Sequence, residues 1–562
     1  MNELLKKAVV KVLKDAGVES KEENLETPPQ PSFGDLSFPC FELAKIQKTN
    51  PQNIAVEIAQ KLVVPRDSVI KGIEATAGYV NFFFAWEKVA GKLLKEVLTK
   101  KGKYGSSSGK KKIMVEFSQP NTNKPMHIGH ARNTVLGYSL SKILDFAGNK
   151  VVKTNYLGDI GLHVAKSMVG YMKWGDREPD KKTDHFVGDF YVRFVNEAKA
   201  NPQLEEEARE LLRKWEAGDK AALALWKKMK DWCLKGFNET YKKLDVNFDV
   251  WFYESDLEKS GKDIVKKLLN KGIAFKSPEG AVVADLEKYG LPSCIILRSD
   301  GTSLYGTKDL QLAIEKFEKY KIDKSIYVVG SEQKTYLQQI FKILELLGYE
   351  KARECYHLAY GLVMLPEGKM SSREGRVVLL DDLLAELEQL AGGVVGKANP
   401  NIGEKEKKNI SEQVALAALK YALLKVSPEK NIIFDKSEVV QFEGDTGPYI
   451  QYAHTRCCGI LEKAGKWKPD FNQENLTEQE INLVKNIARF PAVVEEAARD
   501  LRPHYLCNYV YDLATSFSTF YHACPVLQAE KEKEFRLALV KSTEIILKNA
   551  LELLGIVPLE KM

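Results

Sequence analysis

The sequence predicts a multidomain α/β protein. In it, a Rossmann-type parallel-sheet domain with a helical insertion lies between an N-terminal α+β domain and an all-α C-terminal domain. Three observations support this prediction. Short β-prone runs alternate with helical patterns across the middle of the chain, as in a parallel sheet. A stretch rich in Gly, Ser and Lys at residues 100–112 separates this part from an N-terminal unit. After about residue 380, only helical patterns follow.

The composition is that of a globular protein. The chain has 562 residues, of which 44% are apolar and 28% charged, enough for several domains with large cores. No apolar run reaches the ~18 residues of a membrane span, and the mixed-charge N-terminus is unlike a signal peptide. We therefore expect a cytoplasmic protein with no membrane partner. The eight Cys are scattered without a CxxC pair, so we expect no structural zinc and no disulfide framework. A net charge of +6 permits an anionic partner without requiring one.

The first predicted domain covers residues 1–105. Apolar residues at helical spacing predict helices near residues 4–13 and 54–62, and an alternating aromatic strand follows at residues 78–84. In this strand, Tyr79 and Asn81 could stack on and read an unpaired base if they are exposed. The alternative is an ordinary core strand. The composition of residues 100–112 predicts a flexible, basic linker.

The sheet domain is predicted at residues 106–380. A β-prone run at 113–117, a helical pattern at 134–144 and a second strand at 150–156 form a βαβ unit. A charged, largely helical insertion follows at about 165–275. Strands are expected again at 280–285 and 294–305, with a hairpin turn at Asp300-Gly301. A helix (310–320), a strand (325–330) and a helix (335–347) complete the pattern.

The loop after the first strand of this domain carries the strongest chemical signal, an HxGH pattern at a helix start. Doubly wound folds bind nucleotides at the carboxyl ends of strands, and a helix start offers N–H groups to phosphates. His127 and His130 can donate to phosphate oxygens, and Gly129 lets a flat base approach the backbone. Two unrelated histidines would give this pattern in roughly one such chain in a hundred. The whole motif is Pro120, Asn121, Thr122, Asn123, Lys124, Pro125, Met126, His127, Ile128, Gly129 and His130.

Two later segments also suit phosphate or nucleic-acid contacts. In residues 365–376, the cations Lys369 and Arg373 could close on phosphates, together with the hydroxyls of Ser371 and Ser372. Beyond a helical connector at 381–435, the all-α domain at 436–562 begins with interleaved aromatic and basic side chains. Such residues can stack on bases, although aromatics at helical spacing more often fill cores. They are Tyr449, Tyr452, His454 and Arg456.

The HxGH pattern and the Lys369–Arg373 loop together resemble the motifs of class I aminoacyl-tRNA synthetases. Within this class, the sequence is most similar to the arginyl-tRNA synthetase family. Residues 116–121, 155–159, 303–309, 443–454 and 553–562 look like that family's motifs in the same order. Ser372 departs from the pattern, because the usual KMSKS loop has a second Lys there. In this family a Lys three residues before the first histidine is thought to compensate, and Lys124 stands there. Arg373 is a second candidate.

The resemblance implies ATP-dependent ligation of L-arginine to tRNA(Arg) through arginyl-adenylate, with Mg²⁺ carried by the nucleotide and a monomeric enzyme. It implies catalytic roles for Lys124, His127, His130, Lys369 and Arg373, and ATP contacts from Gly129, Ser371 and Ser372. It also implies that the N-terminal domain contacts the tRNA elbow through Tyr79 and Asn81. The C-terminal domain would read the anticodon through Tyr449, Tyr452, His454 and Arg456. A guanidinium has only donors, so its pocket needs carboxylates. The implied arginine ligands are Glu116, Asn121, Glu254, Tyr305, Asp309 and Gln333.

Three other kinds of protein share some of these features. Other HxGH nucleotidyltransferases are much shorter and lack a C-terminal helical domain. A non-enzymatic tRNA-binding paralogue usually loses the histidines, which are present here with Lys369. A cysteinyl enzyme would need a zinc site, which the Cys spacing does not offer. The order of motifs along the whole chain therefore favours the arginyl family.

Overall fold

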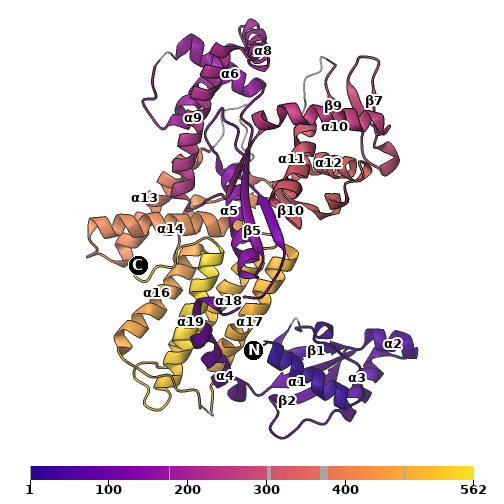
Figure 1. Cartoon of the computed structure of the whole chain (residues 1–562). Coiled ribbons are helices and arrows are strands. Elements are labelled where there is room, and N and C mark those ends of the chain that lie inside the picture. Colours follow the sequence, from indigo (N-terminus) through magenta and orange to yellow (C-terminus); the bar gives the residue numbers. More distant parts are fainter. Residues whose placement is uncertain (1, 29, 176, 300–304, 367–377, 474) are drawn as a thin grey trace.

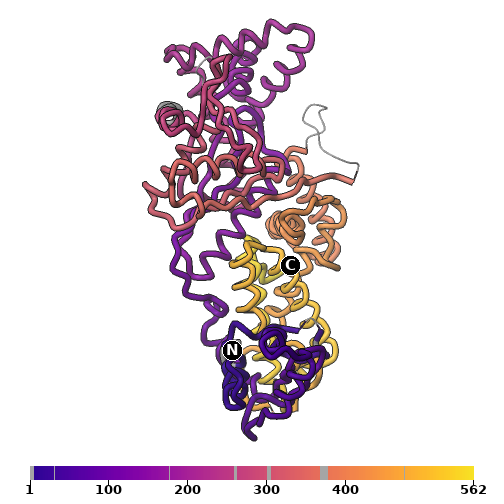
Figure 2. Tube along the Cα trace, turned by 90° about the vertical axis from the view of Figure 1, so that its right-hand side faces the viewer, coloured from indigo at the N-terminus to yellow at the C-terminus, as the bar shows by residue number. Residues whose placement is uncertain are grey.

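The computed structural model describes residues 2–28, 30–175, 177–299, 305–366, 378–473 and 475–562. The molecule is elongated. An N-terminal unit lies at one end and the helices α6 to α9 lie at the opposite end, with the central sheet and a helical bundle between them (Figure 1, Figure 2).

The central sheet has five parallel strands in the order β11-β10-β4-β5-β6. From β4 the chain moves to one side through β5 and β6, and then returns to the other side through β10 and β11. The strand order therefore reverses between β4 and β10, and ligands of such sheets bind at this point. The strands are β4 (Lys112–Glu116), β5 (Lys150–Leu157), β6 (Val250–Tyr253), β10 (Lys324–Gly330) and β11 (Cys355–Tyr360).

Three helices cover this sheet and connect its strands. The predicted strands at 113–117, 150–156 and 325–330 are confirmed as β4, β5 and β10, because each is a β-prone run bounded by turn residues. The helix α5 joins β4 to β5, and its first residue is Ile128 in the HxGH pattern. The helices are α5 (Ile128–Phe146), α11 (Tyr305–Tyr320) and α12 (Lys334–Leu346).

Two predictions about the sheet were wrong. The strand β6 pairs with β5 in the central sheet, although it lies within residues 165–275, which were predicted as a helical insertion. Its four residues are too few for a clear periodic signal. The strands predicted at 280–285 and 294–305 are present as β8 (Val282–Ala284) and β9 (Cys294–Leu297). They do not join the central sheet, however, but form a separate antiparallel sheet with β7 (Ala274–Lys276). This sheet packs with α10 (Glu258–Asn270). The turn predicted at Asp300-Gly301 lies outside the described residues.

Four helices form the insertion between β5 and β6, as the helical patterns predicted. Aromatic rings fill its core, with Phe186 in edge contact with Phe190 at 5.0 Å and with Trp232 at 5.5 Å. The insertion helices are α6 (Leu162–Trp174), α7 (Thr183–Glu197), α8 (Gln203–Glu216) and α9 (Lys220–Lys243).

The N-terminal unit is the predicted α+β fold. Its antiparallel sheet has the order β1-β3-β2, so the predicted aromatic strand is the central one. The fourth helix, α4, leaves this unit and packs on the C-terminal helices α17 and α19. The elements are α1 (Asn2–Asp15), β1 (Leu36–Pro39), α2 (Phe41–Gln47), α3 (Pro51–Lys61), β2 (Ile70–Thr76), β3 (Tyr79–Phe84) and α4 (Trp86–Lys100).

The predicted flexible linker at residues 100–112 is packed at its beginning. Tyr104 is buried and its ring stacks on Phe490 of α17, with centroids 6.2 Å apart. Its hydroxyl donates to the carbonyl of Ile487 at 3.4 Å. The prediction of a flexible linker was wrong at this point, because the Gly, Ser and Lys composition gave no sign that one aromatic side chain would pack into the core.

The C-terminal part is helical, as predicted. A two-residue parallel pair, β12 (Val363–Met364) and β13 (Ile432–Ile433), joins it to the sheet domain. In the described residues, no helix has both the length and the apolar character needed to span a bilayer. The helices are α13 (Leu380–Ala398), α14 (Glu404–Leu424), α15 (Lys436–Val439), α16 (Gly447–Ala464), α17 (Glu478–Asp500), α18 (His504–Ala523) and α19 (Lys533–Leu553).

Candidate active site

The two histidines of the HxGH pattern cap the first turn of α5. Nδ1 of His127 accepts from the Gly129 backbone N–H at 3.1 Å, and Nδ1 of His130 accepts from the His127 backbone N–H at 3.2 Å. Burial, with Lys124 nearby, lowers the pKa of His127 to about 4 and the pKa of His130 well below its usual value. Both rings are therefore neutral at pH 7, and each carries its proton on Nε2. This proton is available to an acceptor such as a phosphate oxygen.

A cavity of about 570 Å³ lies beside this helix start. It brings together Lys124, His127, Gly129 and His130, which the sequence had assigned to ATP binding and catalysis. Burial lowers the pKa of Lys124. Residues 360–364 also line this cavity.

The loop with Lys369, Ser371, Ser372 and Arg373 lies outside the described residues. The segment after it is attached to the histidine loop. The backbone N–H of Ile128 donates to Val378 at 3.2 Å, and that of Leu380 donates to Met126 at 3.0 Å.

Arg132 holds residues 361 and 362, which line this cavity, and the sequence motifs did not predict this role. Its guanidinium is 1% exposed and donates to the carbonyls of Gly361 at 2.7 Å and Leu362 at 3.1 Å. It also donates to the carbonyls of Pro428 at 2.9 Å and Lys430 at 2.7 Å. An Arg five residues after the first histidine was the only available signal.

A second cavity of about 530 Å³ adjoins the first and shares Gln119, Val329 and Gln333 with it. Five of the six residues assigned to arginine binding line this second cavity. They come from the end of β4, the loop after it, the turn after β6, the helix α11 and the turn after β10. The five are Glu116, Asn121, Glu254, Asp309 and Gln333. The side chain of the sixth, Tyr305, is outside what the structure describes.

Asp309 lies in the first turns of α11, which begins at Tyr305 and therefore before the predicted start at residue 310. The Tyr336 hydroxyl donates to its Oδ2 atom. Burial raises the pKa of Asp309 to about 6, and the bond from Tyr336 offsets part of this rise. A guanidinium brought to this carboxylate would favour the charged form. Tyr336 was not predicted, because nothing in its local sequence marks it.

The other two carboxylates of this cavity have cationic neighbours. Glu116 is buried against the ammonium group of Lys316, itself 0% exposed, and accepts from Gln119 at 2.7 Å. Glu254 lies 3.9 Å from Lys308 Nζ. With Asp309, three carboxylates face two ammonium groups, so the cavity carries one excess negative charge among the described residues. This charge complements one guanidinium.

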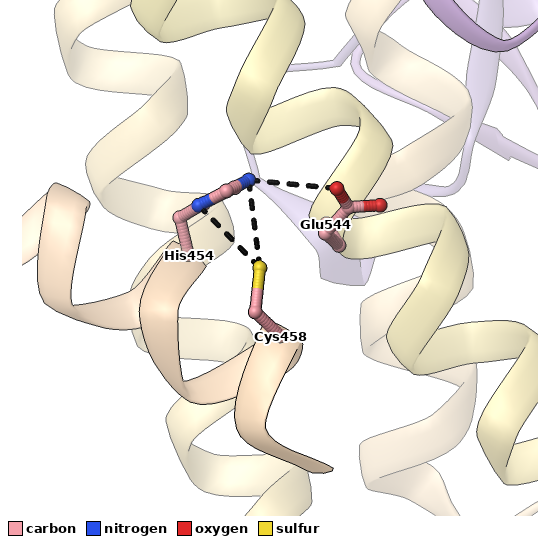
Figure 3. Close-up of side chains that lie close together, drawn as sticks. All are labelled: His454, Cys458 and Glu544. Carbon is pink, nitrogen blue, oxygen red and sulfur yellow. Dashed lines mark hydrogen bonds and ion pairs between the residues drawn. The ribbon is translucent and has the colours of Figure 1, made fainter. Parts of the chain in front are cut away.

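Two residues predicted to contact tRNA are buried, so those predictions were wrong. Asn81 is 3% exposed, and its Oδ1 accepts from Ser37 Oγ at 2.5 Å. Its position in the alternating strand faces the core. His454 is 1% exposed; its Nδ1 lies 2.8 Å from the Leu559 carbonyl and its Nε2 lies 3.6 Å from Glu544. Figure 3 shows this ring between Cys458 and Glu544.

The remaining candidates are more accessible. Tyr452 is 36% exposed, and the guanidinium of Arg456 lies 4.8 Å from its ring centroid and 5.5 Å from that of Tyr521. Tyr449 is half-buried beside Tyr511. In the N-terminal unit, Tyr79 is half-buried in edge contact with a neighbouring Phe.

Family models match three parts of the chain. Residues 93–436 match the model described as "tRNA synthetases class I (R), catalytic domain". Residues 2–84 match "Arginyl tRNA synthetase N terminal domain", and residues 450–562 match "DALR anticodon binding domain". The predicted fold class is confirmed, and the fold, the capped HxGH helix and these matches define a class I aminoacyl-tRNA synthetase.

Several similar proteins are arginine-specific members of this class. The arginine–tRNA ligase of Treponema denticola is 42% identical over 96% of this chain and 95% of that protein. The ligase of Parabacteroides distasonis is 39% identical over 99% and 98%. Thermus thermophilus arginyl-tRNA synthetase matches 100% of both chains with a TM-score of 0.85 and 31% identity. The Plasmodium falciparum enzyme shares the fold, with a TM-score of 0.82 at 21% identity. The chain belongs to the arginyl-tRNA synthetase family.

Proposed function

We propose that this protein ligates L-arginine to tRNA(Arg) at the expense of ATP. The observation that carries this proposal is the pair of adjoining cavities at the point where the strand order reverses. One cavity has neutral imidazoles and a lysine, which suit phosphates. The other has one excess negative charge, which suits a guanidinium.

In this proposal, the guanidinium of arginine lies against Asp309 and Glu254, with Tyr305 as a neighbour. Asn121, Glu116 and Gln333 hold its α-amino and carboxylate groups. Gln333 lines both cavities, so the carboxylate of arginine would lie where the two cavities meet. Lysine lacks the planar fork of donors, so paired carboxylates reject it by geometry.

The first step joins the arginine carboxylate to the α-phosphorus of ATP, and diphosphate leaves. The substrate supplies the nucleophile, so the protein contributes positioning and charge stabilisation. Negative charge that grows on the phosphate oxygens meets the Nε2–H groups of His127 and His130 and the ammonium of Lys124. Lys369 and Arg373, with the hydroxyls of Ser371 and Ser372, would add donors from the loop, and Mg²⁺ enters with the nucleotide.

In the second step, a terminal ribose hydroxyl of the tRNA attacks the adenylate carbonyl, and AMP leaves. We assign anticodon contacts to Tyr449, Tyr452 and Arg456, and elbow contacts to Tyr79. Stacked rings with a guanidinium suit unpaired bases. We further propose a monomeric, cytoplasmic enzyme without zinc. We also propose that residues 1–105, 106–380, 381–435 and 436–562 are its functional divisions.

The first experiment measures aminoacylation of bulk tRNA with each of the twenty amino acids, followed by kinetics of Asp309→Ala. The variant should raise the KM for arginine by about 100-fold or more, since it removes a buried charge partner. Its KM for ATP should stay nearly unchanged. Charging with another amino acid would refute the proposal, and an unchanged KM for arginine would show that the pocket is assigned wrongly.

A second experiment concerns the order of events. Members of this family resemble a few other synthetases in needing tRNA for activation of the amino acid. We expect arginine-dependent exchange of diphosphate into ATP to require tRNA(Arg). Exchange that runs equally well without tRNA would contradict this part of the proposal.

A further inference from the structure

Asp159 is a fully buried carboxylate that follows the carboxyl end of β5 and is not among the residues that line either cavity. Its Oδ1 accepts from the Ser255 backbone N–H at 2.9 Å. Its Oδ2 accepts from Ser255 Oγ at 2.7 Å and from Lys230 Nζ at 2.6 Å. Three donors on one buried carboxylate hold it in a single orientation.

The insertion helix α9 supplies the other half of this cluster. Lys230 Nζ lies 3.8 Å from the ring centroid of Tyr253, besides its ion pair with Asp159. Trp226, one turn earlier on α9, donates its Nε1–H to the Asp159 carbonyl at 2.6 Å. Both the backbone and the side chain of Asp159 are thus attached to the insertion.

Glu254 lies between the two residues that this cluster holds. Tyr253, before it, packs under Lys230, and Ser255, after it, is bonded twice to Asp159. Glu254 is 6% exposed and lines the cavity that also contains Asp309. With both chain neighbours fixed, its main chain cannot shift without breaking bonds to a buried charge.

We propose that Asp159, together with Lys230, is a positioning residue for the amino-acid cavity and acts by fixing Glu254. The proposal rests on the proposed role of Glu254 as an arginine ligand. In this proposal, the insertion helix α9 holds Glu254 in position to bind the guanidinium of arginine. Neither residue needs to touch the substrate.

The test compares Ser255→Ala with Asp159→Asn in aminoacylation assays at saturating ATP and tRNA. Ser255→Ala removes one bond to Asp159 and leaves the backbone bond in place, so the fold is retained. It should raise the KM for arginine by about tenfold, because small displacements of a ligand group weaken binding strongly. Asp159→Asn should raise it further. Neither should change the KM for ATP. Ser411→Ala, which removes a buried hydroxyl bonded within α14, is the matched control and should change neither KM.

The variant Glu254→Gln distinguishes the proposed role of Glu254 as an arginine ligand from the proposed positioning role of Asp159. If it leaves the KM for arginine unchanged, Glu254 is not a ligand and both proposals about it are refuted. If it raises this KM while Ser255→Ala and Asp159→Asn do not, only the positioning role is overturned. In the double variant, Ser255→Ala should add nothing to the effect of Glu254→Gln. Additive effects would show that Asp159 does not act through Glu254.

Discussion

In each histidine at the start of α5, the two ring nitrogens have different roles. Each Nδ1 accepts a backbone N–H of the first turn, at 3.1 Å for His127 and 3.2 Å for His130. Each Nε2–H takes no part in these cap bonds and can donate to the ATP that we propose for the adjoining cavity. The same side chain therefore caps the helix and, in the proposed function, donates to the phosphates, so substitutions that keep the position of only one ring nitrogen can separate these two roles.

We predict opposite effects for His127→Asn and His127→Gln. The Asn oxygen matches Nδ1 and keeps the helix cap, but it cannot reach the position of Nε2. This variant should keep its stability and lose about 100-fold in kcat. The Gln amide reaches the Nε2 position and loses the cap, so it should lose about 1 kcal/mol of unfolding free energy and retain more of kcat. Thermal unfolding and steady-state aminoacylation measure both. Equal loss of kcat in the two variants would contradict a donor role for Nε2.

The raised pKa of Asp309 predicts a pH dependence of arginine binding. The carboxyl titrates near pH 6 in the free protein, and only its charged form attracts the guanidinium. The Kd for arginine should therefore be constant above pH 7 and rise by about tenfold per pH unit below pH 6. His127, with a pKa of about 4, stays neutral over this range and does not contribute.

Calorimetric titration of arginine between pH 5 and 8 measures this profile, and Tyr336→Phe provides the control. The Tyr336 bond lowers the pKa of Asp309, so removing the hydroxyl should move the midpoint to higher pH. A midpoint that stays in place, or moves to lower pH, would mean that another group titrates.

For single residues, the sequence predicted which side chains belong to a site better than it predicted which side chains are exposed. The HxGH pattern marked residues that line the first cavity, and the resemblance to the arginyl-tRNA synthetase family implied several that line the second. The sequence could not place Asn81 and His454, because exposure depends on which face a neighbouring element covers. It also missed Lys316 and Tyr336, which come from separate helices and meet the pocket only after folding.

At the scale of elements, predictions succeeded where a pattern repeats. The unit of β4 and α5 was predicted closely, because a short β-prone run leads through the HxGH loop into a 19-residue helix. The strand β6 has only four residues, and the anchor at Tyr104 is one side chain in a polar stretch. Neither repeats, so periodicity could not reveal them.

The close packing of α5 on the loop after β4 predicts different effects for two Gly→Ala substitutions. A methyl group on Gly137 would lie 2.3 Å from Phe117 Cβ, whereas one on Gly459 in α16 would meet no atom within 4 Å. Gly137→Ala should lower the unfolding free energy by about 1–3 kcal/mol and raise the KM for ATP, since Phe117 leads into the histidine loop. Gly459→Ala should add up to about 1 kcal/mol. Urea unfolding of both variants tests this, and a neutral Gly137→Ala would refute the tight contact.

At the scale of the molecule, the end of α19 and the segment after it connect parts that are distant in sequence. Ser139 on α5 donates to the Leu553 carbonyl at 3.0 Å, and Lys420 on α14 donates to Gly555. Further along, Gln451 and Thr455 on α16 donate to Val557 at 2.8 Å and to Leu559 at 3.0 Å. The sheet domain and the C-terminal bundle are thus tied through one strap, residues 553–562.

His454 also contacts this strap, with its Nδ1 2.8 Å from the Leu559 carbonyl, and Figure 3 shows its ring beside Cys458 and Glu544. Burial alone would lower its pKa, but Cys458, Glu544 and the Leu559 carbonyl together raise it to about 9. The imidazolium present at neutral pH donates to the strap and faces Glu544. Because the folded pKa exceeds the usual value of 6.5, this contribution is complete below pH 6.5 and is lost as pH rises through about 9.

Removing residues 557–562 should therefore destabilise the protein by about 3–9 kcal/mol, because it leaves three donors without their acceptors at about 1–3 kcal/mol each. They are the side chains of Gln451, His454 and Thr455. Removing only residues 560–562 loses the exposed Lys561–Glu462 pair and should cost about 0–1 kcal/mol. Thermal unfolding at pH 6 and pH 9.5 measures both. The gap between the truncations should narrow at the higher pH, where His454 is neutral. Since the bonds to Leu553 and Gly555 remain, the KM for arginine should not change. Equal stability of the two truncations would show that the strap does not hold the bundle.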